Sequence, residues 1–407
     1  MCADARQEPQ APAPEEWVPS PFPFARLAAL RADGPVHRVH VPGSGDAWLV
    51  VTRDAVRTAL TDPRLRNGLR HSGGWESDGG HAVGRSMLQS DPPHHTRLRG
   101  LVAGRFTPGR IAALRPGVEA VARDLLDRLP RTGTADLVRA YALPLPVTVI
   151  CDLLGVPVAD HEAFHTWSNE LVMPTGEEAA AASAAALAGY LTELIARKAR
   201  TPDGSLLADL AATAADAPGQ EAALSPEELL GMTFLLLVAG HETTVNLISA
   251  TVHSLLAHPG QLALLRADPG LTGAAVEESL RLHSPVHAGA FRFAAEPLEL
   301  AGTHVAAGDA VLVSLAAASR DPLAFPDPDR FDITRRPQGH LGFGHGVHHC
   351  LGAPLARVEA TVALRLLVER HPGLALAAEP ESLVWRASTL LRGLTTLPVR
   401  LGRPAPD

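Results

Sequence analysis

The sequence predicts a mostly α-helical protein with small β-sheets. Three observations indicate this class. The chain has 407 residues, of which 46% are hydrophobic, so it can build a sizeable core. Long segments with helix start and stop signals dominate the sequence, and the few alternating segments are short. No internal repeat or long linker divides it, and we expect a disordered tail over residues 1–20 and one domain over residues 21–407.

Short strands are expected where apolar and polar residues alternate or where turns bound an apolar run, at residues 47–52, 298–300 and 311–315. Residues 68–84 hold six glycines without periodicity, which predicts a mobile loop of the kind that covers a site. The alanine-rich residues 177–188 predict a helix.

The clearest helix begins at Ser225, which caps it, with Pro226 at the first position and Glu228 completing a capping box. It should run to about His258, because Pro259 follows, and its apolar middle predicts that it is buried. A second helix follows Cys350, since apolar residues recur at spacings of three and four from residue 351 to residue 366. Cys350 therefore lies just before a helix N-terminus.

Composition excludes several classes of protein. The three cysteines (Cys2, Cys151 and Cys350) are scattered and odd in number, which argues against a disulfide framework and for a reducing compartment. The N-terminus is acidic and proline-rich rather than signal-like, and no uncharged apolar run reaches the roughly 18 residues of a spanning helix, so we expect a soluble cytoplasmic protein without a membrane partner. The net charge of −8 and the 4% of aromatic residues argue against nucleic-acid binding.

The segment from Phe343 to Gly352 concentrates the chemistry. Its glycines allow tight turns and close approach to a flat ligand, and it delivers one sulfur to a helix start, where N–H groups and the helix dipole favour a thiolate. Two alternatives are a structural buried cysteine and a zinc site. The zinc site would draw on crowded, adjacent ligands that rarely close a tetrahedron: His345, His348, His349 and Cys350.

Two other patterns carry polar groups into helices. Glu242 and Thr243 lie in the middle of the long apolar helix, where polar groups are costly unless they are used. The alternative is that the threonine only bonds back to the carbonyl four residues earlier. Glu278 and Arg281 are three residues apart and so share a helix face, a spacing that is also typical of a simple surface ion pair.

Residues 343–352 match the pattern Phe-Gly-x-Gly-x-His-x-Cys-x-Gly at every fixed position, so the chain resembles the cytochrome P450 family from about Pro35 to Leu401. The resemblance implies the P450 fold, with haem b between the two helices and Cys350 as the axial iron ligand. It assigns the haem propionates to His95, Arg99, Arg292 and His348 and further haem contacts to Ala239, Gly240, Phe343, Gly344 and Gly352.

The same resemblance implies that Glu242 and Thr243 deliver protons, with a helix bend beside Gly240 making room for dioxygen and water. Glu278 and Arg281 would form a structural triad with Arg330. The substrate pocket would be formed by the loop over residues 68–84, the segment 286–290, and Leu235, Val238, Ala239, Val286, His287 and Ala288. His287 would either bond a substrate oxygen or point to solvent.

The implied reaction is hydroxylation or epoxidation of a small natural product in secondary metabolism, such as antibiotic biosynthesis. Electrons would come from NAD(P)H through a ferredoxin and a ferredoxin reductase, and the protein would be a monomer. We expect the ferredoxin to dock on a basic patch made by Arg97, Arg105, Arg110 and Arg357. Two other functions stay open: oxidative aryl or phenol coupling without oxygen insertion, and a non-catalytic haem-binding or recruitment module.

Overall fold

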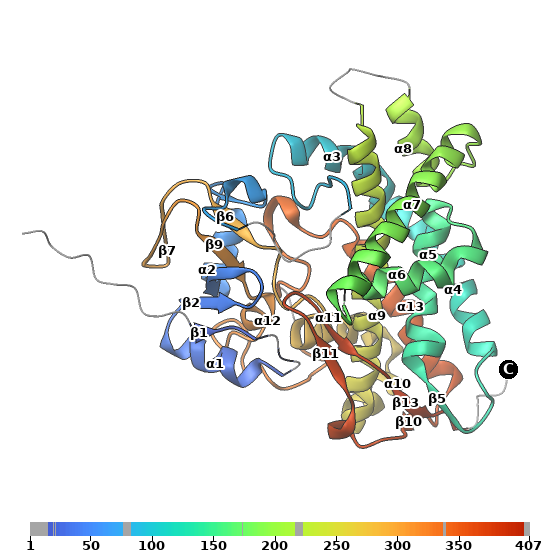
Figure 1. The fold of residues 1–407 in the computed structure, drawn as a ribbon. Coiled ribbons are helices and arrows are strands. Elements are labelled where there is room, and N and C mark those ends of the chain that lie inside the picture. Colours follow the sequence, from blue (N-terminus) through green and yellow to red (C-terminus); the bar gives the residue numbers. More distant parts are fainter. Residues whose placement is uncertain are drawn as a thin grey trace, which may run out of the picture.

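The structure is a computed structural model that describes residues 15–18, 20, 22–75, 83–172, 174–215, 223–336 and 339–402. Helices make up most of it, and the larger sheet lies to one side with α1, α2 and α12 (Figure 1). The helices are α1 Phe24–Asp33, α2 Arg53–Thr61, α3 His94–Ala103, α4 Pro108–Asp127, α5 Pro144–Leu154, α6 His161–Val172, α7 Glu177–Arg200, α8 Leu206–Ala215, α9 Pro226–Ala257, α10 Pro259–Ala267, α11 Thr272–His283, α12 Leu315–Ala318 and α13 Ala353–Arg370.

The strands are short, as the sequence predicts. They are β1 Glu15–Glu16, β2 Val36–Val41, β3 Gly45–Val50, β4 Leu65–Arg66, β5 Thr134–Asp136, β6 Arg292–Ala294, β7 Leu298–Leu300, β8 Thr303–Val305, β9 Ala310–Val313, β10 Ala375–Leu376, β11 Trp385–Ala387, β12 Arg392–Leu394 and β13 Pro398–Arg400. The strands expected at residues 47–52, 298–300 and 311–315 are confirmed as β3, β7 and β9.

The largest sheet joins segments that are far apart in the chain. Its strand order is β1-β2-β3-β9-β6-β4, and β3 pairs in parallel with β9 in the register Ala47↔Ala310 to Val50↔Val313. Three smaller sheets have the orders β10-β13-β5, β11-β12 and β7-β8. Glu15 and Glu16 pair with β2, so the tail expected over residues 1–20 does not reach residue 20; residues 1–14 lie outside the described part.

Helix α9 forms the centre of the helical part, in contact with α5, α11 and α13 (Figure 1). Its capping box is confirmed: the Ser225 hydroxyl accepts from the Glu228 backbone N–H at 3.2 Å, and the Glu228 carboxylate accepts from the Ser225 N–H at 2.9 Å. The helix ends at Ala257, immediately before the Pro259 that the sequence identifies as its stop, and most of its side chains are buried. The second expected helix is α13, which packs on α4, α9 and α11.

Among the described residues, α7 and α9 are long and apolar enough to span a membrane by length and composition alone. The apolar window of α9 is 72% buried inside the protein, which is typical of a core helix. The corresponding window of α7 is 22% buried, and this helix contacts α6, α8 and α9. One or two such helices are weak evidence for a membrane protein, because core helices pass the same test.

Candidate active site

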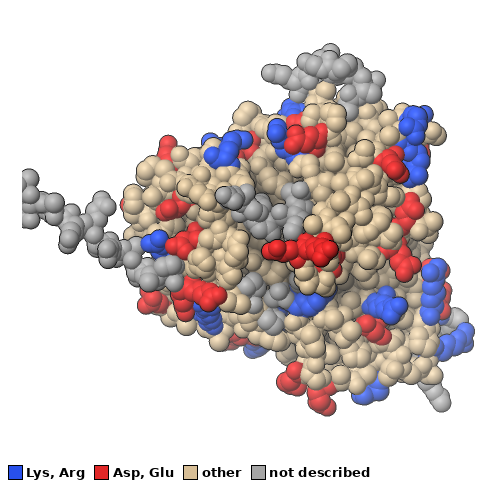
Figure 2. Space-filling model, in the orientation of Figure 1, with Lys and Arg blue, Asp and Glu red and all other residues tan. Residues whose placement is uncertain are grey.

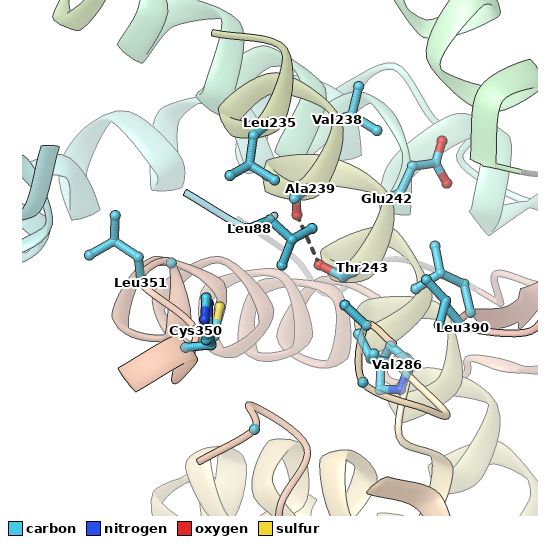
Figure 3. Close-up of a pocket in the computed structure, with 18 of the residues that line it drawn as sticks. Leu88, Leu235, Val238, Ala239, Glu242, Thr243, Val286, Cys350, Leu351 and Leu390 are labelled. Carbon is cyan, nitrogen blue, oxygen red and sulfur yellow. Dashed lines mark hydrogen bonds between the residues drawn. The ribbon is translucent and has the colours of Figure 1, made fainter. Parts of the chain in front are cut away.

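A cavity of about 1180 Å³ lies between α9 and the loop that precedes α13. Figure 3 shows Cys350 on one wall and, facing it across the cavity, Ala239 and Thr243 of α9. The predicted site residues that line it are Leu235, Val238, Ala239, Gly240, Glu242, Thr243, His95, Arg99, Val286, Ala288, Arg292, Phe343, Gly344, His348, Cys350 and Gly352. Of the expected loop over residues 68–84, Val83 lines the cavity, and residues 76–82 lie outside the described part.

The loop before α13 is folded so that it presents the Cys350 sulfur to the cavity. The Cys350 backbone N–H donates to the Phe343 carbonyl at 2.9 Å, which closes the loop on itself. Gly346 has φ +74°, and a Cβ atom at this position would lie 2.7 Å from the Leu60 carbonyl oxygen, so both its conformation and its packing require glycine. Helix α13 then begins at Ala353, three residues after the sulfur.

The surroundings of Cys350 act on the pKa of its thiol in opposite directions. Burial raises the pKa of the Cys350 thiol, and the backbone N–H groups of Gly352 and Ala353 and the charges of Arg99 and Arg357 offset this only in part. The helix start lowers this pKa but does not by itself outweigh burial. A metal cation bound to the sulfur would supply further positive charge, because a coordinating thiol is deprotonated.

Four cationic or potentially cationic side chains converge on the cavity beside Cys350: His95, Arg99, Arg292 and His348. The rings of His95 and His348 lie 4.3 Å apart between centroids, and Arg292 is 4% exposed. Burial, together with the charges of His95, Arg292 and Arg99, lowers the pKa of His348 to about 3. Burial also lowers the pKa of Arg292 to about 10.

This cluster has little compensating negative charge: Asp91 acts on His95 and Arg292 without forming an ion pair with either. Both ring nitrogens of the buried His95 are without a hydrogen-bond partner, and none of the four residues forms an ion pair with a carboxylate of the described part. Buried cations and unpartnered nitrogens are costly unless an anion meets them. The cluster therefore fits a ligand with two carboxylates next to a sulfur-bound metal, and haem, with its two propionates and its iron, is such a ligand.

On the opposite wall, Thr243 and Glu242 differ in their surroundings. The Thr243 hydroxyl donates to the Ala239 carbonyl at 3.2 Å, which is the back-bond that we considered as an alternative, but the residue also lines the cavity (Figure 3). Glu242 is 4% exposed. Burial favours a raised pKa for Glu242, but the hydrogen bond and charge of His241, with the charges of His165 and Arg386, outweigh it and lower the pKa.

His241 is a site residue that the sequence reasoning missed. It is fully buried, and its Nε2 lies 3.3 Å from the Glu242 carboxylate and 3.1 Å from the Ser168 hydroxyl. Its Nδ1 lies 2.8 Å from the Leu237 carbonyl, to which it donates. A histidine directly before the buried Glu242 in an apolar helix was the signal that could have identified it.

Gly240 lines the cavity and also allows a close contact between two helices. It lies in helix α9, which runs from Pro226 to Ala257. A Cβ atom on Gly240 would lie 2.9 Å from Cγ1 of Ile150, which belongs to α5. Glycine at this position therefore allows α5 to pack closely against α9.

The structural triad is confirmed only in part. Arg281 donates from Nε and Nη2 to the two carboxylate oxygens of Glu278, at 2.8 and 2.9 Å, and both side chains are fully buried, so this is no surface pair. The assignment of Arg330 as the third member is wrong: its side chain pairs with Asp332 and is 62% exposed. The third arginine is Arg335, whose Nε donates to Glu278 at 3.2 Å. Arg330 contributes only its carbonyl oxygen, which accepts from Arg281.

The prediction for His287 is also wrong. His287 does not line the large cavity, whereas its neighbours Val286 and Ala288 do. It does not point to solvent either, because it is 7% exposed and its ring contacts Phe24 at 5.9 Å between centroids. Backbone bridges at Val286 and Ala288 hold this segment extended, so alternate side chains point to opposite sides.

The expected basic patch is largely neutralised. Arg97 pairs with Glu228, Arg105 pairs with Asp209, and Arg357 donates twice to Glu277, at 2.6 and 2.9 Å. Of the four arginines, Arg110 alone is exposed without an ion pair to a described residue. Figure 2 shows basic and acidic side chains interspersed over the visible face.

Comparisons with known proteins agree with this site. The family model described as "Cytochrome P450" matches residues 160–372. The chain is 49% identical over 383 residues to "Cytochrome P450 monooxygenase PikC" of Streptomyces venezuelae, covering 94% of this chain and 91% of that protein. It is 43% identical over 380 residues to "Mycinamicin IV hydroxylase/epoxidase" of Micromonospora griseorubida, covering 92% and 94%. The solved structure of the polyketide synthase cytochrome P450 PksS from Bacillus subtilis matches with a TM-score of 0.86 and 36% identity, covering 94% of this chain and 97% of that one.

Proposed function

The chain belongs to the cytochrome P450 family of haem monooxygenases, and we propose that its substrate is a polyketide-type natural product. It is a haem b enzyme that hydroxylates or epoxidises a small molecule in secondary metabolism, using dioxygen and electrons from NAD(P)H that arrive through redox partners. The substrate class is supported by the names of two relatives, the mycinamicin IV hydroxylase/epoxidase and the polyketide synthase cytochrome P450 PksS. A cavity of about 1180 Å³ leaves room for a large substrate.

The observation that carries the proposed site is the placement of Cys350 and the unpaired cations on one wall and of Thr243 on the other. In the proposed arrangement Cys350 ligates the iron, and His95, Arg99, Arg292 and His348 hold the propionates. Gly344, Gly352 and Phe343 would lie against the haem on the Cys350 side, and Ala239 and Gly240 would line the opposite side. Bound haem supplies the iron that activates dioxygen.

The two polar residues of α9 would handle protons. The Thr243 hydroxyl donates a hydrogen bond to the Ala239 carbonyl, so its oxygen is free to accept a hydrogen bond from a water or a substrate group in the cavity. The Glu242 carboxylate, whose pKa is lowered, is ionised at neutral pH and can take up a proton from its surroundings. His241 holds this carboxylate in place at 3.3 Å. Glu242 and Thr243 would thus pass protons into the cavity one at a time.

We further propose a monomeric cytoplasmic protein that takes its electrons from a ferredoxin. The relatives are bacterial, which supports this setting. Because three of the four arginines of the expected patch are paired, electrostatic steering of an acidic partner should be weak. Charge reversal of Arg110 should therefore lower the reduction rate at low salt only modestly, and an unchanged rate would place the docking surface elsewhere.

The test is turnover with polyketide intermediates in the presence of dioxygen labelled with the heavy oxygen isotope. We expect one labelled oxygen atom in the product, and a Thr243→Val variant should form product at least about tenfold more slowly. A coupled product without the label would favour the aryl or phenol coupling function. Haem binding without NAD(P)H consumption or product across the panel would favour a recruitment module.

A further inference from the structure

An arginine faces the cavity on the side of α6, away from the Cys350 loop. Arg386 of β11 and Asn169 of α6 both line the cavity, and Arg386 Nη1 donates to Asn169 Oδ1 at 3.2 Å. The Arg386 charge acts on Glu242 and His165, whereas the arginines that act on Cys350 are Arg99 and Arg357. Arg386 therefore belongs to the substrate region rather than to the propionate cluster.

The bonding capacity of Arg386 is incompletely used. Its Nε is buried and has no hydrogen-bond partner, and its guanidinium forms no ion pair with any carboxylate in the described part of the chain. A guanidinium presents five N–H donors in a planar fork, of which Asn169 accepts one. A buried N–H donor without a partner is costly, and a ligand that accepts a hydrogen bond from it would remove this cost.

We propose that Arg386, oriented by Asn169, is a subsite that binds a carboxylate of the substrate. A carboxylate matches the guanidinium fork through two parallel hydrogen bonds, which a single hydroxyl or ester carbonyl cannot do. A substrate anchored there would place its apolar part against the α9 residues that line the same cavity, among them Leu235, Val238 and Thr243. This inference rests on the proposed function and narrows it to acidic substrates or acidic biosynthetic intermediates.

Arg386 could instead serve only to brace β11 against α6 through Asn169. The two roles differ in their dependence on charge. An Arg386→Gln substitution keeps an amide that can donate to Asn169 but removes the positive charge and the fork, whereas Arg386→Lys keeps the charge without the fork. A bracing role predicts that Gln is tolerated for every ligand, and a carboxylate subsite predicts a loss that is specific for acids.

The experiment compares myristate with its methyl ester, two probes of equal chain length that differ in charge. Binding to the haem-loaded protein is measured by equilibrium dialysis and by the shift of the haem absorption band, in wild type, Arg386→Gln, Arg386→Lys and the distant surface control Arg110→Gln. We expect the wild type and the control to bind myristate at least about tenfold more tightly than the ester. Arg386→Gln should lose this preference while its ester affinity stays unchanged, and Arg386→Lys should keep part of it.

Equal binding of both probes by the wild type, or an unchanged preference in Arg386→Gln, would overturn the proposal. Failure of the subsite can be told apart from failure of the proposed function. The carbon monoxide spectrum of the reduced protein reports on the haem centre without any substrate, so it does not depend on how the acid is bound. A variant that binds haem normally but loses only acid selectivity identifies Arg386 as a specificity residue.

Discussion

Replacing Arg335 should destabilise the protein far more than replacing Arg330, although the two arginines lie in the same loop. The structure assigns them different surroundings. Arg335 is 14% exposed and donates to the fully buried Glu278 at 3.2 Å, and also to the carbonyls of Pro326 and Asp327 at 2.6 and 3.0 Å. The Arg330 side chain is 62% exposed and pairs only with Asp332. Methionine is the substitution of choice at both positions, because it keeps an unbranched stem without charge.

The expected magnitudes follow from burial. Removing one partner of a buried ion pair costs about 3–5 kcal/mol, but Glu278 keeps its two hydrogen bonds from Arg281, so we expect about 2–4 kcal/mol for Arg335→Met. An exposed pair contributes about 0–1 kcal/mol, which is the expected cost of Arg330→Met. An unfolding entropy of about 2.1 cal/mol/K per residue over 407 residues converts these costs to Tm shifts of about 2–5 °C and about 1 °C or less.

The assay is scanning calorimetry of both haem-loaded variants beside the wild type at one scan rate, with haem content measured for each. We expect the lower Tm and the lower haem retention in Arg335→Met, because its partner Glu278 lies on α11, which packs against α13. Equal Tm losses in the two variants, or the larger loss in Arg330→Met, would refute the assignment of Arg335 as the third member of the buried network.

Three further substitutions test the packing and charge of the site. Gly240→Ala should lower the free energy of unfolding by about 1–3 kcal/mol, because its Cβ would lie 2.9 Å from Ile150. The additional substitution Ile150→Val should recover part of this loss, measured by urea unfolding. A Gly240→Ala variant more stable than the wild type would contradict the close packing. His95→Phe removes two unpartnered nitrogens and should increase the rate of haem transfer to an apoprotein scavenger by about tenfold or more. An unchanged transfer rate would argue against propionate binding by His95. The pKa of His287 is lowered to about 3, mainly by burial and then by nearby arginine charges, so the unfolded chain takes up its proton first as the pH falls below about 6.5. The free energy of unfolding should therefore decrease from pH 6.5 towards pH 3. In denaturant unfolding, this decrease should be smaller in His287→Phe, which keeps the ring contact with Phe24. An equal decrease in the wild type and the variant would show that His287 is not the group responsible.

Local signals account for the elements that the sequence predicts well. The start of α9 depends on Ser225 and Glu228, which satisfy each other's backbone N–H groups within four residues, so the sequence alone defines it. The loop around Cys350 is likewise local, because glycine at residue 346 fixes its turn. The polar residues of α9 could be identified because they interrupt an apolar helix.

Contacts between distant residues could not be predicted. The parallel pairing of Ala47 with Ala310 spans most of the chain, and no short pattern encodes it. The pair of Arg386 and Asn169 joins residues 217 positions apart. Arg330 was assigned because it matches the family's pattern in residues 325–331, and only the folded loop shows that its side chain pairs with Asp332 while Arg335 reaches Glu278.

The direction of the His287 side chain could not be predicted either, because it also depends on contacts with distant residues. It lies in an extended segment whose neighbours form isolated bridges to Leu391 and Ser314, so a shift by one residue would exchange cavity-facing and core-facing side chains. The ion pairs of Arg97 and Arg105 could not be predicted for the same reason, because their acidic partners lie on other helices.

The most direct test of the central claim is the absorption spectrum of the dithionite-reduced protein with and without carbon monoxide, in wild type and in Cys350→Ala. Haem ligated by the Cys350 sulfur predicts a strongly red-shifted Soret band in the wild type that is absent from the variant. A wild-type protein that binds no haem, or whose band is that of a histidine-ligated haem, would contradict the assignment of Cys350 and the active site built around it.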